Sequence, residues 1–106
     1  DGFIVVTTPQ ALAKLDAKRS VNMIRKMNVN ILGVVENMSG DMFGSGAGEE
    51  LAKETGTPFL GRLELRREYR DVTRPTVLVS KKVSQEYDQI IGNVLPRLEV
   101  LAQPAG

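Results

Sequence analysis

The apolar residues of segment 31–35 follow one another without alternation and stop abruptly at Glu36 and Asn37. Such a run, rich in β-branched residues, is typical of a strand of a parallel sheet that helices cover on both faces. Ligands of such sheets bind beyond the carboxyl ends of the strands. Asn37 is the first side chain there that can both donate and accept hydrogen bonds, so it could match the edge of a base.

Residues 3–7 predict a second buried strand. Thr8 then resembles an N-cap and Pro9 a first helical residue, because the fixed φ and missing N–H of proline are tolerated there. Apolar positions at helical spacing extend this helix to about Met27. Two buried strands joined by a long amphipathic helix predict a βαβ unit in which both strands end at one crevice.

The next part of the chain predicts shorter elements. Residues 49–55 predict a short helix, residues 59–65 a third strand near the sheet edge, and residues 67–73 a short charged helix. The fold class is therefore α/β, a Rossmann-like sheet of about three mostly parallel strands with flanking helices.

The last third of the chain predicts one docked segment and one long helix. Residues 76–80 are apolar enough to dock on the body of the domain. A helix starts at Ser84, and Pro96 should kink or end it. Residues 103–106 predict a frayed tail, which leaves residues 1–102 as one structural unit.

The composition excludes several kinds of site. The chain of 106 residues contains no cysteine and no histidine, so it has no thiolate metal site, no cysteine nucleophile and no Ser-His-Asp arrangement. A cytoplasmic setting agrees with the absence of cysteine. No apolar run approaches the roughly 18 residues of a membrane span. A net charge of +1 with five aromatic residues argues against a nucleic-acid surface.

The glycine-rich segment 44–48 does not have the spacing of a phosphate loop, because no Lys-Ser/Thr pair follows it. Glu49 and Glu50 would lie in the first turn of the next helix, where they repel a phosphate. This segment predicts a flexible loop that leads into a helix. A group of arginines interleaved with acidic residues predicts a solvated, salt-bridged surface. These arginines are Arg62, Arg66, Arg67, Arg70 and Arg74.

Several motifs together resemble one known family. They are V-V-T-T-P-Q at 5–10, L-D-A-K-R at 15–19, N-M at 22–23, L-G-V-V-E-N-M-S at 32–39 and F-G-S-G at 43–46. The chain resembles the Mrp/ApbC family, MinD-like P-loop ATPases that carry iron–sulfur clusters. The resemblance implies that residues 1–102 are the C-terminal portion of such an ATPase domain.

The resemblance also implies a nucleotide site. Asn37 matches the family asparagine that hydrogen-bonds adenine, and residues 60–66 match a segment that usually reads L-G-x-I-P-L-D and lines the base and ribose. In this chain Glu64 replaces the proline and Arg66 the aspartate. The implied nucleotide-binding residues are Thr8, Pro9, Glu36, Asn37, Met38, Leu63, Glu64 and Leu65.

The implied function is iron–sulfur cluster assembly or transfer by a homodimeric parent protein that binds ATP or ADP with magnesium. The family's phosphate loop is not in this chain, so we predict no catalytic residue here and no ATP hydrolysis by the chain alone. Without cysteine, the chain offers no thiolate to a cluster. Two alternatives stay open: a non-catalytic α/β protein-interaction module, and a MinD-like ATP-switched regulator without cluster binding.

Overall fold

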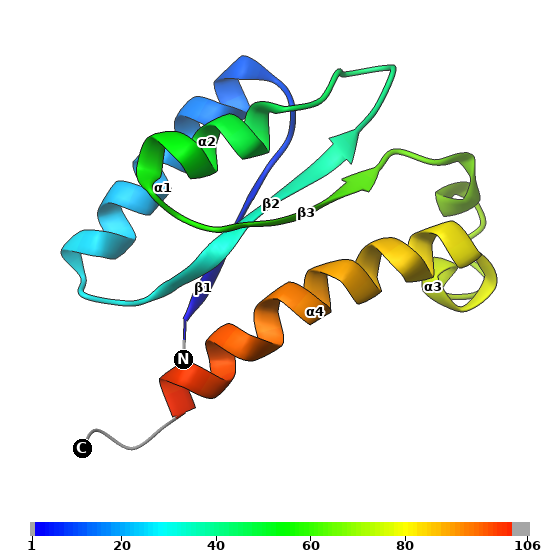
Figure 1. The fold of residues 1–106 in the computed structure, drawn as a ribbon. Coiled ribbons are helices and arrows are strands. Elements are labelled where there is room, and N and C mark those ends of the chain that lie inside the picture. Colours follow the sequence, from blue (N-terminus) through cyan, green and yellow to red (C-terminus); the bar gives the residue numbers. More distant parts are fainter. Residues whose placement is uncertain (1, 103–106) are drawn as a thin grey trace.

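The computed structural model describes residues 2–102 and contains one three-stranded sheet, with all described strands parallel and in the order β1-β2-β3 (Figure 1). The elements in chain order are β1 (Phe3–Thr7), α1 (Ala11–Lys26), β2 (Ile31–Ser39), α2 (Ala47–Thr55), β3 (Phe59–Glu64), the 3-10 helix η1 (Arg67–Arg70), α3 (Thr76–Val79) and α4 (Lys81–Ala102). The predicted α/β class with about three parallel strands is confirmed. The predicted frayed tail, residues 103–106, lies outside the described residues.

Helices cover β2 on both faces, as its apolar run predicts. Helices α1 and α2 lie on one face of the sheet and α4 lies on the other (Figure 1). Val34 belongs to a buried cluster with residues of α1 and α2, including Val21 and Leu51. Val35 belongs to a second cluster, with Leu60 of β3 and Ile90 of α4. Side chains on opposite faces of β2 therefore anchor the two layers of helices.

The prediction that residues 3–7 form a strand is confirmed, but the prediction that this strand is buried is wrong. Val5 and Thr7 are buried beneath the α1 layer, whereas Ile4 is 41% and Val6 56% exposed. The reason is that α4 packs on β2 and β3, so it leaves the same face of β1 uncovered. Strand β1 lies at an edge of the sheet.

Helix α1 starts two residues later than predicted, so Thr8 is not its N-cap and Pro9 is not helical. Gln10 is extended (φ −70°, ψ 138°) and occupies the N-cap position, and the Lys14 amide donates to its carbonyl oxygen at 3.0 Å. The helix ends at Lys26, close to the prediction. Met27, the last of the apolar positions at helical spacing, is 61% exposed.

Helix α4 starts at Lys81 rather than at Ser84, and it continues through Pro96 to Ala102. The earlier start follows from Ser80, whose hydroxyl oxygen accepts the amide hydrogen of Val83 at 3.3 Å. Near the proline, the Asn93 side chain donates to the Leu60 carbonyl oxygen at 2.7 Å, which attaches the helix to β3. Tertiary packing therefore outweighs the helix-breaking preference of Pro96.

The connection between β3 and α4 has less helix than predicted. Only Arg67–Arg70 is helical within residues 67–73, because an Asp71 carboxylate oxygen accepts hydrogen bonds from both the amide (2.9 Å) and the hydroxyl (2.6 Å) of Thr73. This contact closes a local turn that competes with a longer helix. Residues Thr76–Val79 form one helical turn that packs against α4, with none of its residues buried.

Candidate functional site

The three strands run in the same direction, so their carboxyl ends lie together at one end of the sheet, as the parallel arrangement predicts (Figure 1). Thr7 of β1 lies beside Glu36 of β2 in the strand register, and Ser39 of β2 lies beside Glu64 of β3. The loops that follow β2 and β3 therefore begin next to each other.

The ends of β2 and β3, with the loops that follow them, border an open hollow of about 620 Å³. Residues 38–42 line it from the end of β2, and residues 64–67 with Arg70 line it from the end of β3. The Leu65 amide donates to the Ser39 carbonyl oxygen at 3.0 Å, which joins the two walls. The hollow has the position at which α/β sheets bind ligands.

Three of the predicted site residues line this hollow: Met38, Glu64 and Leu65. Asn37 directly precedes it and is half-buried. The Asn37 side-chain oxygen accepts the Met38 amide hydrogen at 2.9 Å, and Met38 has a φ of +55°, which is uncommon outside glycine. This contact orients the side-chain amide of Asn37, whose NH₂ group makes no hydrogen bond within the described part of the chain.

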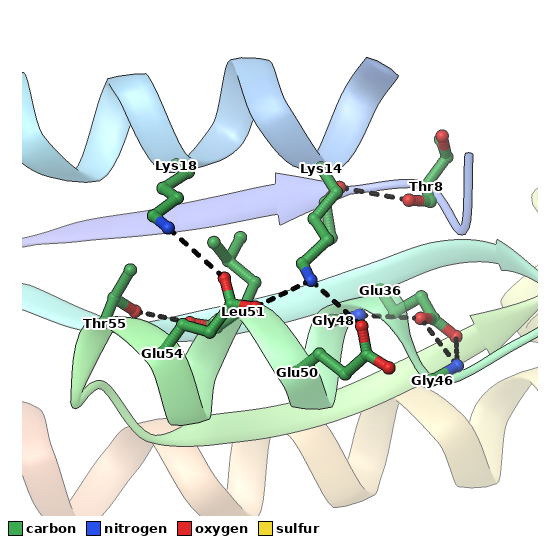
Figure 2. Close-up of polar contacts among 11 residues, drawn as sticks. Thr8, Lys14, Lys18, Glu36, Gly46, Gly48, Glu50, Leu51, Glu54 and Thr55 are labelled. Atoms are coloured by element: carbon green, nitrogen blue, oxygen red, sulfur yellow. Dashed lines mark hydrogen bonds and ion pairs between the residues drawn. The ribbon is translucent and has the colours of Figure 1, made fainter. Parts of the chain in front are cut away.

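Glu36, another predicted site residue, is fully buried and does not line the hollow. Its carboxylate accepts the Gly48 amide hydrogen at 2.8 Å and the Gly46 amide hydrogen at 3.1 Å (Figure 2). These amides belong to the start of α2, which begins at Ala47, two residues earlier than predicted. The carboxylate thus occupies the positive end of the α2 dipole, where an external anion would otherwise bind.

The other three predicted residues lie away from the hollow. Leu63 is partly buried against the cluster of Val35, Leu60 and Ile90. Thr8 and Pro9 follow the end of β1 and are half-buried. The Thr8 hydroxyl oxygen is buried and has no hydrogen-bond partner among residues 2–102.

Sequence reasoning missed one contact of the site, the pairing of Arg66 with Glu86 of α4. The Arg66 Nε lies 3.3 Å and its Nη2 3.2 Å from the two Glu86 oxygens, and the side chains are only 16% and 15% exposed. The hydrogen bond to Glu86 raises the pKa of Arg66 above its ordinary value. The sequence predicted a solvated arginine, and no local pattern connects two residues 20 positions apart.

Metal ligands do not gather in the described part of the chain. No group of three or more His, Cys, Asp or Glu side chains there could hold a metal ion. The chain also has no cysteine, so its residues do not fit an iron–sulfur cluster that needs thiolate ligands. Among residues 2–102, no helix has the length and apolar character needed to cross a membrane.

Comparison with known proteins gives one family and several relatives. A family model described as "ParA: NUBPL iron-transfer P-loop NTPase" matches residues 1–98. The iron-sulfur cluster carrier protein of Methanocaldococcus jannaschii is 41% identical over 112 residues, which cover 93% of this chain and 39% of the relative. The cytosolic Fe-S cluster assembly factor CFD1 of Candida glabrata is 44% identical over 82 residues, which cover 68% of this chain and 29% of the relative.

A solved structure has the same fold. The cell division ATPase MinD of Pyrococcus furiosus superposes with a TM-score of 0.72 at 21% identity, covering 93% of this chain and 42% of that chain. This likeness concerns the fold alone. The chain spans about 39% of the length of the carrier protein that it matches, so it corresponds to a part of such proteins.

Proposed function

Because this chain belongs to the ParA family of NUBPL iron-transfer P-loop NTPases, we propose that it is the base-binding portion of an ATP-dependent iron–sulfur cluster carrier. The observation that carries the proposal is the hollow at the carboxyl ends of β2 and β3, which Met38, Glu64 and Leu65 line. Family membership supplies the class of ligand, and the hollow supplies a place for its base.

The chemistry of the hollow suits a purine ring. Met38 and Leu65, 42% and 44% exposed, offer apolar surface from opposite walls. Asn37 directly precedes Met38, and its NH₂ group, which makes no hydrogen bond among residues 2–102, can donate to a ring nitrogen of adenine. We assign the base to this hollow, with Asn37 as its polar contact.

The phosphate loop and the magnesium ligands of an ATPase are not supplied by this chain. The chain has no phosphate-loop motif, and Glu36 fills the start of α2. We therefore assign phosphate binding and hydrolysis to another part of a longer protein, in which residues 1–102 form the C-terminal portion. The edge position of β1 supports a sheet that continues beyond these three strands, and the exposed Ile4 and Val6 support further structure over the face of β1 that α4 leaves uncovered.

The iron–sulfur cluster is the cargo in this proposal, and its ligands lie outside this chain, which has no cysteine. We further propose that the complete protein is a homodimer that works in the cytosol. The family resemblance supports the dimer, and the name of the C. glabrata relative, a cytosolic assembly factor, supports the location.

Nucleotide titration followed by amide NMR tests the proposal. Mg-ATP should shift the signals of residues 35–39 and 61–65 more than Mg-GTP does. Asn37→Ala should weaken binding about 3- to 10-fold, the effect of one hydrogen bond, with the spectrum still dispersed. The control is Asn22→Ala, because Asn22 lies on the exposed surface of α1. Unchanged affinity in Asn37→Ala, or no response to ATP in the wild-type chain, would contradict the proposal.

A further inference from the structure

Arg66 stands in the wall of the hollow, and we propose that its guanidinium group is a second base-binding element, a flat cation on which the purine ring stacks. The inference rests on the function proposed above and adds a residue to that site. The evidence for this inference is that Arg66 contacts Glu86 and lies in the wall of the hollow.

The guanidinium is held at two points by one carboxylate. Its Nε and Nη2 atoms donate to the two different oxygens of Glu86, at 3.3 Å and 3.2 Å. A two-point contact between two planar groups fixes the orientation of the guanidinium plane as well as its position. Because both side chains are largely buried, solvent competes little with this contact.

The same carboxylate also fixes the backbone of the wall. One Glu86 oxygen accepts the amide hydrogen of Glu64 at 3.1 Å, two residues before Arg66. Glu86 therefore attaches both the end of β3 and the Arg66 side chain to α4. The wall is formed before a ligand arrives, so binding does not have to order it.

The guanidinium group of Arg66, paired in this way, is suited to contact a base rather than a phosphate. Two carboxylates balance its charge, Glu86 and also Glu64, whose oxygen lies 3.3 Å from Nη2. Its attraction for a phosphate is therefore weakened, whereas the faces of its planar group can still stack on an aromatic ring. Arg67 and Arg70 line the same hollow, but they are exposed and form no ion pair within the described residues.

The test uses two ligands that separate the base from the phosphate: adenosine, which has no phosphate, and ribose 5-phosphate, which has no base. Both are titrated into the isotope-labelled chain and followed by NMR. Arg66→Lys keeps the charge but loses the planar group, and it should weaken adenosine binding about 3- to 10-fold. Ribose 5-phosphate should bind the variant and the wild type equally. Arg19→Lys is the matched control, since Arg19 is exposed on α1.

A spectroscopic signal separates stacking from a purely structural role. A purine ring stacked on the guanidinium should shift the side-chain proton signals of Arg66 upfield through its ring current. Glu86→Gln, which keeps an oxygen for the Glu64 amide but loses the charge, should reduce both this shift and the affinity for adenosine. If Arg66→Lys loses its dispersed spectrum, Arg66→Met and the ring-current shift in the wild-type chain decide the question.

The outcomes distinguish this inference from the proposed function. Two results would overturn the role of Arg66 and leave the base site in place. One is an affinity for adenosine that is the same in Arg66→Lys and in the wild type. The other is adenosine binding to the wild type without an upfield shift of the Arg66 signals. A loss of ribose 5-phosphate binding alone would also overturn it, because Arg66 would then be a phosphate ligand. A wild-type chain that responds to neither adenosine nor ATP would overturn the proposed function itself.

Discussion

Replacing Glu36 by alanine should lower the free energy of unfolding by about 2–4 kcal/mol. The carboxylate is fully buried and accepts the amide hydrogens of Gly48 and Gly46. A buried amide that loses its partner costs about 1–3 kcal/mol, and the Gly46 amide, only partly buried, costs less. Loss of the negative charge at the start of α2 lowers the free energy of unfolding by roughly 0.3–2 kcal/mol more. Part of this loss is offset, because the carboxylate no longer has to be desolvated on folding.

Glu36→Gln should cost about half as much as Glu36→Ala. Glutamine has nearly the same volume and keeps one oxygen for the Gly48 amide at the position where the carboxylate accepts it at 2.8 Å. The same oxygen also accepts the Gly46 amide hydrogen, at 3.1 Å. Glutamine nevertheless loses the charge, and its NH₂ group takes the place of the second oxygen, which lies 3.4 Å from the Gly46 nitrogen. A drop of about 1–2 kcal/mol follows, since hydrogen bonds to charged groups are roughly twice as strong as neutral ones.

Urea unfolding of both variants measures these differences, with an unchanged dependence on urea as the sign that the unfolded state is not altered. Amide hydrogen exchange adds a local measurement, because the Gly46 and Gly48 amides should exchange faster in Glu36→Gln while those of β3 do not. Glu99→Gln, an exposed change on α4, is the control and should stay within about 0.5 kcal/mol. If both Glu36 variants also stayed within that range, the reasoning would be refuted.

Two further predictions concern α2 and α4. Gly48→Ala should destabilise the chain by about 1–3 kcal/mol, because the new Cβ would lie 2.8 Å from the Glu36 Cβ. Gly92→Ala, with open space around it, should stabilise α4 by about 0.5–1 kcal/mol. Urea unfolding of the two variants compares these effects. The hydrogen bond from Lys14 lowers the pKa of Glu54 below about 4.5, so this contact stabilises the fold above pH 4.5 and is lost as the pH falls through the lowered value. In Lys14→Met the free energy of unfolding should therefore fall less between pH 6 and pH 3 than it does in the wild type. An equal fall in the variant and the wild type would contradict this prediction.

The sequence predicted the central strand and the end of the sheet that carries the site, because both follow from residues close together in the chain. The apolar run before Glu36 shows by itself that β2 is covered on both faces. The run at residues 3–7 is also apolar and rich in β-branched residues, yet Ile4 and Val6 are exposed. What covers a strand depends on where α4 packs, about 80 residues later in the chain, and no local pattern reports it.

The same limit explains the misplaced end of the last helix and the missed contact. Pro96 is a strong local signal for the end of a helix, but Asn93 is attached to the Leu60 carbonyl oxygen, and that contact comes from another element. Arg66 belongs to a charged segment typical of a solvated surface, and only the fold brings Glu86 to it. Apolar runs and the order of the elements could be predicted, whereas the capping residues of α1 and α4 and the partners from distant elements could not.

Two buried or largely buried carboxylates hold the loops around the hollow, one on each side. Glu36 holds the start of α2 and thereby the far end of the loop that leaves β2, and Glu86 holds the end of β3. Each accepts backbone amide hydrogens, so each fixes main chain rather than a single side chain. The entropy cost of ordering these loops is therefore met when the chain folds and not when a ligand binds. The walls of the hollow therefore keep their shape through main-chain contacts rather than through the side chains that line it.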